Sequence, residues 1–464
     1  MMKKRISFIH RPAVQRVLYL VVLLTLILMA VVQTYQLWTQ MERPGERNLD
    51  SWQVEPDAQA SMLEPFDMYL TRDGIRFARI NTLSGFYQDL WTVSRTLIIR
   101  MVRSGFTVTR VDEEELPENK AGIALQYACP LPAEAIRDLL MIEEDVADIE
   151  EIILIPSQTR NEPVTLYLVD RDQSHILRAE SNINVSARAA QNFNERFMDC
   201  LDAVAPEYID AHRRFPAMFL DGCYVHELES SSMYHIPEIS VSYVDDDVLD
   251  TEMAASYIMH FFEHPDVARQ VEQGEDFVWY ADEKHTVRYD VHGLLQYVST
   301  QKPSEREMLP LTEAYQLACG FLREDLAYDR TLLQEIYLCD FESSGDGTYT
   351  FSWNYAYNHV PFSMSGETRR WTDLDYPIRI VVEGRQVRYY HRYLLDKNMA
   401  ADGIFSIRET YIDALDQILD GLPEQTRVRS FGLEYEEVDG RPVLYWKVDT
   451  DRGLLSMPAG EVRV

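Results

Sequence analysis

Basic side chains are in short supply in this sequence. It has 44 lysines and arginines against 76 aspartates and glutamates, which gives a net charge of −32. A surface this acidic repels phosphate backbones and other anionic polymers, so the composition excludes nucleic-acid binding. Direct binding to the anionic polymers of a cell wall is also disfavoured, unless divalent cations bridge the two surfaces.

Cysteine is scarce as well. There are five cysteines, an odd number, and no C-x-x-C motif. Small secreted domains held together by disulfides carry dense and usually even cysteines, so a disulfide scaffold is not expected here. The sequence instead predicts small buried hydrophobic side chains at these positions. A single bridge, for instance between Cys319 and Cys339, is still compatible with the sequence.

The signatures of common active sites are missing. There is no G-x-S-x-G motif, and Ser365–Gly366 lacks the preceding glycine; no glycine-rich phosphate-binding loop is present either. With 76 acidic residues, no carboxylate pair can be singled out as a glycosidase dyad without geometry. We therefore expect a protein that is not an enzyme, with no catalytic residue, no cofactor and no metal.

One string could still carry metal chemistry, the H-x-x-E-H of residues 260–264. On a helix, His260 and His264 would share a face and could hold zinc, with Glu263 as the base. However, Pro265 follows directly, and the residue before a proline is pushed away from helical geometry. No third ligand stands out nearby. We therefore interpret these histidines as structural, and keep a membrane-anchored envelope metallohydrolase as the less favoured alternative.

The sequence contains one long uncharged apolar run, the 22 residues Val17–Trp38. As a helix it would reach about 33 Å, enough to cross a hydrocarbon core of about 30 Å. The run is too long for the apolar region of a signal peptide and lacks a small-residue cleavage context, which favours an uncleaved anchor over a cleaved signal. The charges before the run are all basic: Lys3, Lys4, Arg5, Arg11 and Arg16.

That charge asymmetry predicts a cytoplasmic N-terminus and places the bulk of the chain outside the cell membrane. The exterior part then carries 39 basic and 76 acidic residues, a net charge of −37. Within the anchor, Thr25 and Gln33 could hydrogen-bond a neighbouring helix, although Thr25 could equally bond its own backbone and Gln33 could reach the interface. The candidate residues for contact with a partner helix share one helical face: Val22, Thr25, Leu26, Met29 and Gln33.

After the anchor, helical periodicity alternates with short strand patterns, which predicts an α+β fold of helices packed on antiparallel sheets. In the last part of the chain, a helix, a strand, a tight turn and a strand occur twice, with the helices at 311–322 and 406–419. The predicted boundaries are a cytoplasmic tail at 1–16, the anchor at 17–38, a linker at 39–60, and α+β units at 61–205, 206–303 and 304–464.

Aromatic residues alternate along one predicted strand and therefore share one face of a sheet: Tyr349, Phe351, Trp353, Tyr355 and Tyr357. Such a face is more often part of a core than a platform for a ligand. An extracytoplasmic ligand-binding module that uses these tyrosine-rich sheets is nevertheless a second alternative.

Several stretches resemble the YycH regulators of Gram-positive bacteria and their relative YycI, after the basic tail and single anchor. They are ALQYACPLPAEAIRDLL (124–140), MHFFEHPDVARQ (259–270), VWYADEKHTVRYDVHGLLQYV (278–298), FSWNYAYNHVPFSM (351–364) and IRIVVEGRQVRYYHRY (378–393). The last two resemble the C-terminal region that YycH shares with YycI. The resemblance implies a non-enzymatic regulator beside a WalK-type sensor histidine kinase of a cell-wall two-component system. It also implies contact through transmembrane helices, with a YycI-like protein as a second candidate partner.

Overall fold

The computed structural model describes residues 64–463 with short gaps, at 113–115, 117–119, 141–147, 157–162, 171–175, 182–186, 221–222, 227–232, 242–243, 246–247, 267, 302–307, 329–334, 408–410, 421–422, 424 and 439–440. Of the described residues, Met259–Ala268 form one unit and all others form a second. No helix in this described part is long and apolar enough to span a membrane. The predicted anchor Val17–Trp38 lies outside the described residues.

Nine strands of the described chain form an antiparallel sheet in the order β3-β7-β6-β5-β4-β1-β2-β8-β9. The strands are β1 (Asp67–Thr71), β2 (Arg76–Asn81), β3 (Phe106–Val111), β4 (Gly122–Leu131), β5 (Ile149–Ile155), β6 (Thr165–Val169), β7 (Ile176–Ser181), β8 (Tyr208–Asp210) and β9 (Tyr224–His226). The helices are α2 (Tyr87–Ser104), α3 (Ala133–Leu140), α4 (Ala187–Ala203) and α5 (Ala211–Arg214).

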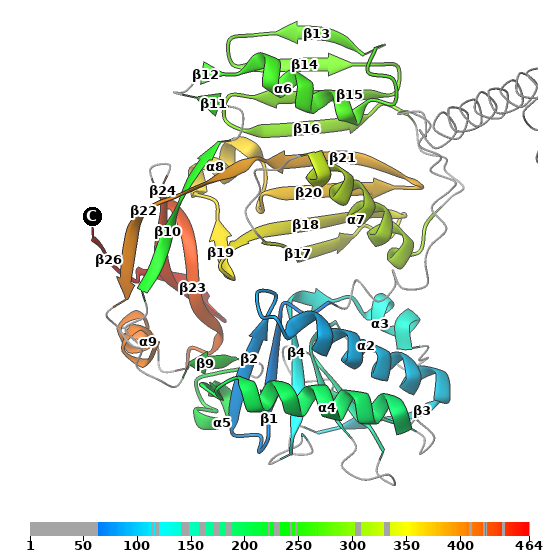
Figure 1. Ribbon diagram of the computed structural model, residues 1–464, viewed down its shortest axis with the longest axis vertical. Helices are drawn as coiled ribbons and strands as arrows, with labels where there is room; N and C mark the ends of the chain where they lie inside the picture. Colours follow the sequence, from blue (N-terminus) through cyan, green and yellow to red (C-terminus); the bar gives the residue numbers. More distant parts are fainter. Residues whose placement is uncertain are drawn as a thin grey trace, which may run out of the picture. The chain divides into compact units, whose positions relative to one another are not determined.

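Helices α2 and α4 pack against each other and cover one face of this sheet (Figure 1). Helix α2 buries Leu90, Leu97 and Met101, which recur at helical spacing. It ends at Gly105, whose φ of 81° lies in a region that side chains with a Cβ rarely adopt. The glycine thus marks the C-terminal end of α2.

Twelve strands of the described chain form a second sheet, in the order β13-β14-β15-β16-β21-β20-β18-β19-β23-β24-β25, with β17 paired to β18. The strands are β13 (Arg269–Gln273), β14 (Phe277–Ala281), β15 (His285–Asp290), β16 (Leu294–Ser299), β17 (Glu335–Ser343), β18 (Thr348–Tyr357), β19 (Val360–Ser363), β20 (Ile378–Glu383), β21 (Gln386–Tyr393), β23 (Val428–Val438), β24 (Arg441–Thr450) and β25 (Gly453–Pro458). The pairings in this sheet are antiparallel except that of β19 with β23.

Two helices lie on one face of this second sheet, α6 (Thr251–Ile258) on β14 and β15, and α7 (Leu311–Tyr328) on β18, β20 and β21 (Figure 1). Apolar side chains of the strands alternate toward this buried face, as expected for a sheet with one covered side. The predicted aromatic face belongs to it, because all of its members are buried: Tyr349, Phe351, Trp353, Tyr355 and Tyr357. The interpretation of these aromatics as core is confirmed.

A buried ion pair ties both helices to the strands. Arg392 of β21 and Asp325 of α7 are 0% and 1% exposed and form a salt bridge. The hydroxyls of Tyr257 in α6 and Tyr390 in β21 donate to the same carboxylate. Arg392 Nε also donates to Tyr355 Oη at 3.2 Å. Both charges are therefore compensated inside the core, as buried charges require.

The remaining described elements are short or lie at the edges of the sheets. Strands β10 (Met233–Val241), β22 (Leu395–Ile407) and β26 (Gly460–Arg463) form a three-stranded sheet, and β11 (Val244–Asp245) pairs with β12 (Val248–Leu249). The other helical segments are the 3-10 turn η5 (Met259–Phe261) and the helices α8 (Gly366–Thr372) and α9 (Tyr411–Leu419).

The predicted α+β class is confirmed, but the predicted start of one helix is wrong. The helix predicted over 406–419 begins only at Tyr411. Ser406 and Ile407 instead extend β22, where they pair with Glu461 and Gly460 of β26. Tertiary strand pairing thus overrides the local helical pattern.

Each large sheet also combines strands from two of the predicted units. Strands β8 and β9, from the predicted middle unit, complete the first sheet, and β16 from that unit pairs with β21 from the predicted C-terminal unit. The boundaries themselves at 205/206 and 303/304 stay predictions.

Candidate functional site

A tight turn between β18 and β19 carries a histidine into a buried position. The strands pair up to Tyr357 and Val360, so Asn358 and His359 form a two-residue turn. Both have positive φ, 49° and 61°. Two-residue hairpin turns require this left-handed geometry, and asparagine is a preferred first residue. The second position usually holds glycine, so a histidine there adopts a strained conformation.

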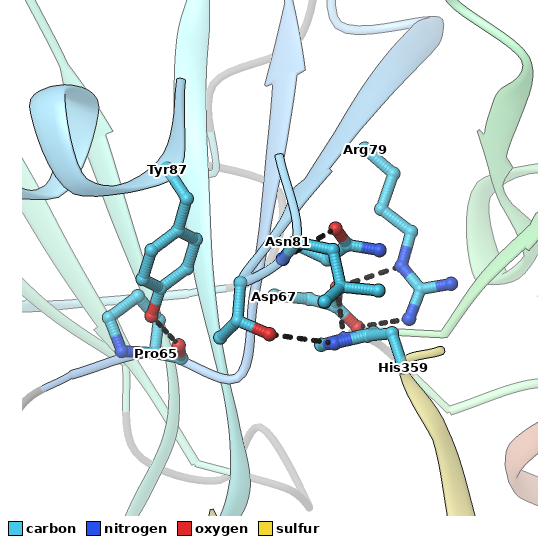
Figure 2. A network of polar contacts seen from close by, with 8 residues as sticks. Pro65, Asp67, Arg79, Asn81, Tyr87 and His359 are labelled. Carbon is cyan, nitrogen blue, oxygen red and sulfur yellow. Dashed lines mark hydrogen bonds and ion pairs between the residues drawn. The ribbon is translucent and has the colours of Figure 1, made fainter. Parts of the chain in front are cut away.

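The imidazole of His359 contacts strand β1 of the nine-stranded sheet (Figure 2). Its Nε2 lies 3.0 Å from Asp67 Oδ1, and its Nδ1 lies 3.2 Å from Thr82 Oγ1. Arg79 of β2 binds the same carboxylate in a bidentate manner, with Nε to Oδ1 and Nη2 to Oδ2 both at 2.8 Å. Paired, charge-assisted hydrogen bonds of this kind are the strongest that side chains make.

The electrostatics of this cluster favour an ionised Asp67. Burial of the carboxyl opposes its charge, but attraction to Arg79 and the hydrogen bond from His359 outweigh burial and lower the pKa of Asp67 to about 2. At neutral pH the carboxylate therefore accepts hydrogen bonds, and His359 donates through Nε2–H. The three residues form a buried clamp, Asp67–Arg79–His359, between strand β1 and the β18–β19 turn.

Aromatic side chains surround this clamp. The Phe66 ring stacks on His359 with centroids 4.2 Å apart, and it lies 4.4 Å from the Tyr337 ring of β17. Beside them is a cavity of about 210 Å³ lined by the segment 64–66 before β1 and by residues of α2, β4, α7, β17 and β18. Tyr87, Tyr315 and Trp353 contribute much of its wall.

The clamp has the features of a mechanical link rather than a reacting centre. Asp67 and His359 are almost fully buried, the Arg79 side chain is 25% exposed, and both basic side chains bond the Asp67 carboxylate. Strand β1 is the first strand of the described chain, and it follows the predicted linker 39–60 closely. The clamp thus joins the strand nearest the predicted anchor to the twelve-stranded sheet.

The residues that the sequence suggested for a metal do not share one helical face in the structure. Helix α6 ends at Ile258, and His260 lies in the 3-10 turn that follows. Glu263 and His264 come after that turn, so no α-helical face brings the two histidines together. Within the described ranges, no group of three histidine, cysteine, aspartate or glutamate side chains could hold a metal ion.

All five cysteines are free thiols, so the bridge considered between Cys319 and Cys339 does not form. Burial raises the pKa of the Cys319 thiol to about 11, and that of Cys129 to about 12. Thiols with such values are unreactive at neutral pH. The interpretation of the cysteines as small buried hydrophobic residues agrees with this chemistry.

The five anchor residues proposed for a helix contact lie outside the described residues: Val22, Thr25, Leu26, Met29 and Gln33. Sequence reasoning missed the clamp entirely. Asn358 carries a local turn signal, because asparagine favours two-residue hairpins. Nothing local connects His359 to Asp67, which lies 292 residues earlier in the chain.

The described chain is thus an α+β protein whose two large, mainly antiparallel sheets are linked by a buried ionic clamp. A scan against protein-family models finds no match, and no curated protein matches the sequence. Among solved structures, the chain is similar to the crystal structure of YycH from Bacillus subtilis, at 10% sequence identity and a TM-score of 0.46. The similarity covers 87% of this chain and 97% of that chain.

Proposed function

We propose that this protein is a membrane-anchored, extracytoplasmic regulator that modulates a WalK-type sensor histidine kinase and is not itself an enzyme. The observation that carries the proposal is the single uncharged run Val17–Trp38, which has only basic charges before it and a large acidic region after it. The stretches that resemble YycH and YycI regulators, including 351–364 and 378–393, support the same function. A YycI-like protein is the second partner in this proposal.

In this proposal the anchor packs on the transmembrane helices of the kinase through the face that holds Thr25 and Gln33. Polar side chains within a bilayer favour contacts with other helices, where their hydrogen bonds are satisfied. The exterior part senses or relays a state of the cell envelope. Energetic coupling needs elements that respond together, and the clamp between Asp67 and His359 supplies such a connection at the first strand of the described exterior part.

An anchor exchange tests this contact. Residues 17–38 are replaced by an unrelated uncharged helix of the same length, and the basic tail 1–16 is kept so that the orientation is unchanged. We expect the exchanged protein to reach the membrane and to lose its effect on kinase autophosphorylation, because its helix no longer complements the kinase. The measurement compares kinase output with the native protein, with the exchanged protein and without either.

A matched control replaces only residues outside the proposed face, such as Leu20 and Ile27, by other apolar residues. This control should modulate the kinase as the native anchor does. Unchanged modulation by the fully exchanged anchor would show that the helix contact is not the route of regulation.

A further inference from the structure

The face of the twelve-stranded sheet opposite α6 and α7 holds polar side chains in cross-strand rows. One row runs through four paired positions on neighbouring strands: Asp340 of β17, Ser352 of β18, Arg379 of β20 and His391 of β21. The next row includes Glu342, Thr350 and Tyr389 on the same strands. Since side chains alternate along a strand, both rows point to the same face.

These rows line a groove of about 350 Å³, which Leu374, Asp375 and Tyr376 border from the segment after α8. This is the size range of small-molecule sites, about 300–1,000 Å³. The Tyr389 side chain is 39% exposed, so its ring is available for contact. The groove lies apart from the clamp, and neither the anchor nor the clamp accounts for it.

The charges of the groove are separated along the rows. Asp340 and Glu342 stand on β17, and Asp375 adds a third carboxylate. One oxygen of Asp340 accepts the N–H of Phe341 at 2.8 Å, which holds this carboxylate in place. Arg379 stands two strands away, which corresponds to about 10 Å at the usual strand spacing of about 4.8 Å. The groove thus has an acidic end and a basic position on the other side.

The basic position is defined by a contact between Arg379 and His391. Arg379 Nη2 lies 3.2 Å from His391 Nδ1. A guanidinium can only donate, so Nδ1 accepts and the imidazole proton resides on Nε2. Burial and repulsion by Arg379, against a weaker attraction to Asp373, lower the pKa of His391 to about 4. The histidine is therefore neutral at physiological pH and offers one N–H donor.

Among the described residues, the ionic contact of Arg379 is a weak one. Its Nη2 lies 3.9 Å from the carboxylate of Asp373, whose side chain is 98% exposed. Pairs this exposed contribute little, because water screens both charges. The guanidinium can therefore take a carboxylate from a ligand, and guanidinium and carboxylate match in geometry.

We propose that this groove binds a short zwitterionic peptide of about three residues, with its ammonium group at Asp340 and Glu342 and its carboxylate at Arg379. An extended chain spans about 3.3–3.6 Å per residue, so the two ends of a tripeptide lie about 10 Å apart, as the two ends of the groove do. Three carboxylates against one cation disfavour a purely anionic ligand. Tyr389 provides an apolar contact for the middle of the peptide.

This site goes beyond the proposed regulation of a kinase, since it names the chemistry of a ligand for the exterior part. The two proposals can fail separately, because peptide binding is measured without any kinase. The probe is trialanine, titrated calorimetrically into the full-length protein in detergent micelles. Trialanine amide and N-acetyl-trialanine serve as probes that lack one terminal charge.

We expect trialanine to bind and each blocked peptide to bind about tenfold or more weakly, since each lacks one charge-assisted contact. Arg379→Gln should weaken the binding of trialanine by a similar factor and leave the affinity for trialanine amide unchanged. Glu342→Gln should weaken the binding of trialanine and leave the affinity for N-acetyl-trialanine unchanged. This crossed pattern distinguishes loss of a contact from misfolding, and Glu342 lies on the surface, where the substitution is tolerated.

Matched controls are Glu275→Gln and Arg452→Gln, which remove exposed charges outside the groove and should bind trialanine as the native protein does. The proposal is overturned if trialanine does not bind, or if both blocked peptides bind as well as trialanine. It is also overturned if the control variants weaken binding as much as the groove variants, or if a neutral saccharide binds there and trialanine does not.

Discussion

Replacing Asp325 by alanine should lower the free energy of unfolding by about 3–5 kcal/mol, the usual cost of leaving one partner of a buried ion pair behind. Arg392 would keep its charge in the core with no carboxylate to compensate it. The hydroxyls of Tyr257 and Tyr390 would lose their acceptor at the same time. Because these groups come from α6, α7 and β21, the loss affects both helices that cover the sheet.

The measurement is the midpoint of urea denaturation, followed by tryptophan fluorescence, for the native protein and Asp325→Ala. A matched control is Asp202→Ala, which breaks the ion pair with Arg72; these side chains are 69% and 51% exposed. Exposed pairs contribute about 0–1 kcal/mol, so this variant should unfold close to the native midpoint. Similar midpoints for Asp325→Ala and Asp202→Ala would contradict the role assigned to the buried pair.

A double variant separates the loss of attraction from the burial of a lone charge. Asp325→Leu combined with Arg392→Met removes both charges and keeps apolar volume in the core. Replacing a buried pair by apolar residues is often neutral or stabilising, so the double variant should recover most of the stability lost in Asp325→Ala. If the double variant is as unstable as Asp325→Ala, the loss of stability comes from altered packing and not from the unpaired charge.

Asp67→Asn should destabilise the protein by about 2 kcal/mol at neutral pH, and the difference from the native protein should shrink in acid. The pKa of Asp67 falls from 3.8 to about 2 on folding. A pKa that falls by about two units on folding corresponds to a stabilisation of the folded protein by about 2–3 kcal/mol. Asparagine cannot ionise, so the variant lacks this stabilisation. The substitution keeps the shape of the side chain, so the change reports on the charge.

The lowered pKa of Asp67 determines how its contribution to the stability of the protein changes with pH. A carboxyl whose pKa is depressed by folding contributes its full stabilisation above its unfolded pKa, near 4. The contribution is lost as the pH falls through its folded pKa, about 2. Denaturation midpoints of native protein and Asp67→Asn should therefore differ most above pH 5 and converge toward pH 2.

Asp202→Asn serves as the control, because its ion pair with Arg72 is exposed and contributes about 0–1 kcal/mol, so this variant should unfold close to the native midpoint. A gap between native protein and Asp67→Asn that stays constant from pH 7 to pH 3 would mean that Asp67 is not held ionised by Arg79 and His359. The clamp would then be a packing contact only.

Local structure was largely predictable from the sequence. The apolar spacing of 87–104 and the glycine at 105 are local signals that account for the extent of α2, and Glu383–Gly384 form the turn that joins β20 to β21. The alternation from Tyr349 to Tyr357 indicated one buried face, which the structure confirms. These features depend on residues close together in the chain, where periodicity and turn chemistry act directly.

Long-range pairing was not predictable in the same way. β16 pairs with β21, although two helices and four other strands of the sheet lie between them in the described sequence. The start of the helix expected at 406 is replaced by strand pairing with the C-terminal β26. The clamp between Asp67 and His359 depends on how the sheets meet, and no single stretch encodes it. Patterns in a single sequence predict local helices, strands and turns, but they do not identify which distant strands pair.

Co-purification from the native membrane shows whether the anchor brings this protein to a sensor kinase. The native protein and the version with residues 17–38 exchanged are isolated in mild detergent, and the proteins recovered with each are identified by mass spectrometry. We predict that a WalK-type sensor histidine kinase is recovered with the native anchor and lost with the exchanged one. Recovery of no kinase with either form, or of equal amounts with both, would contradict the claim.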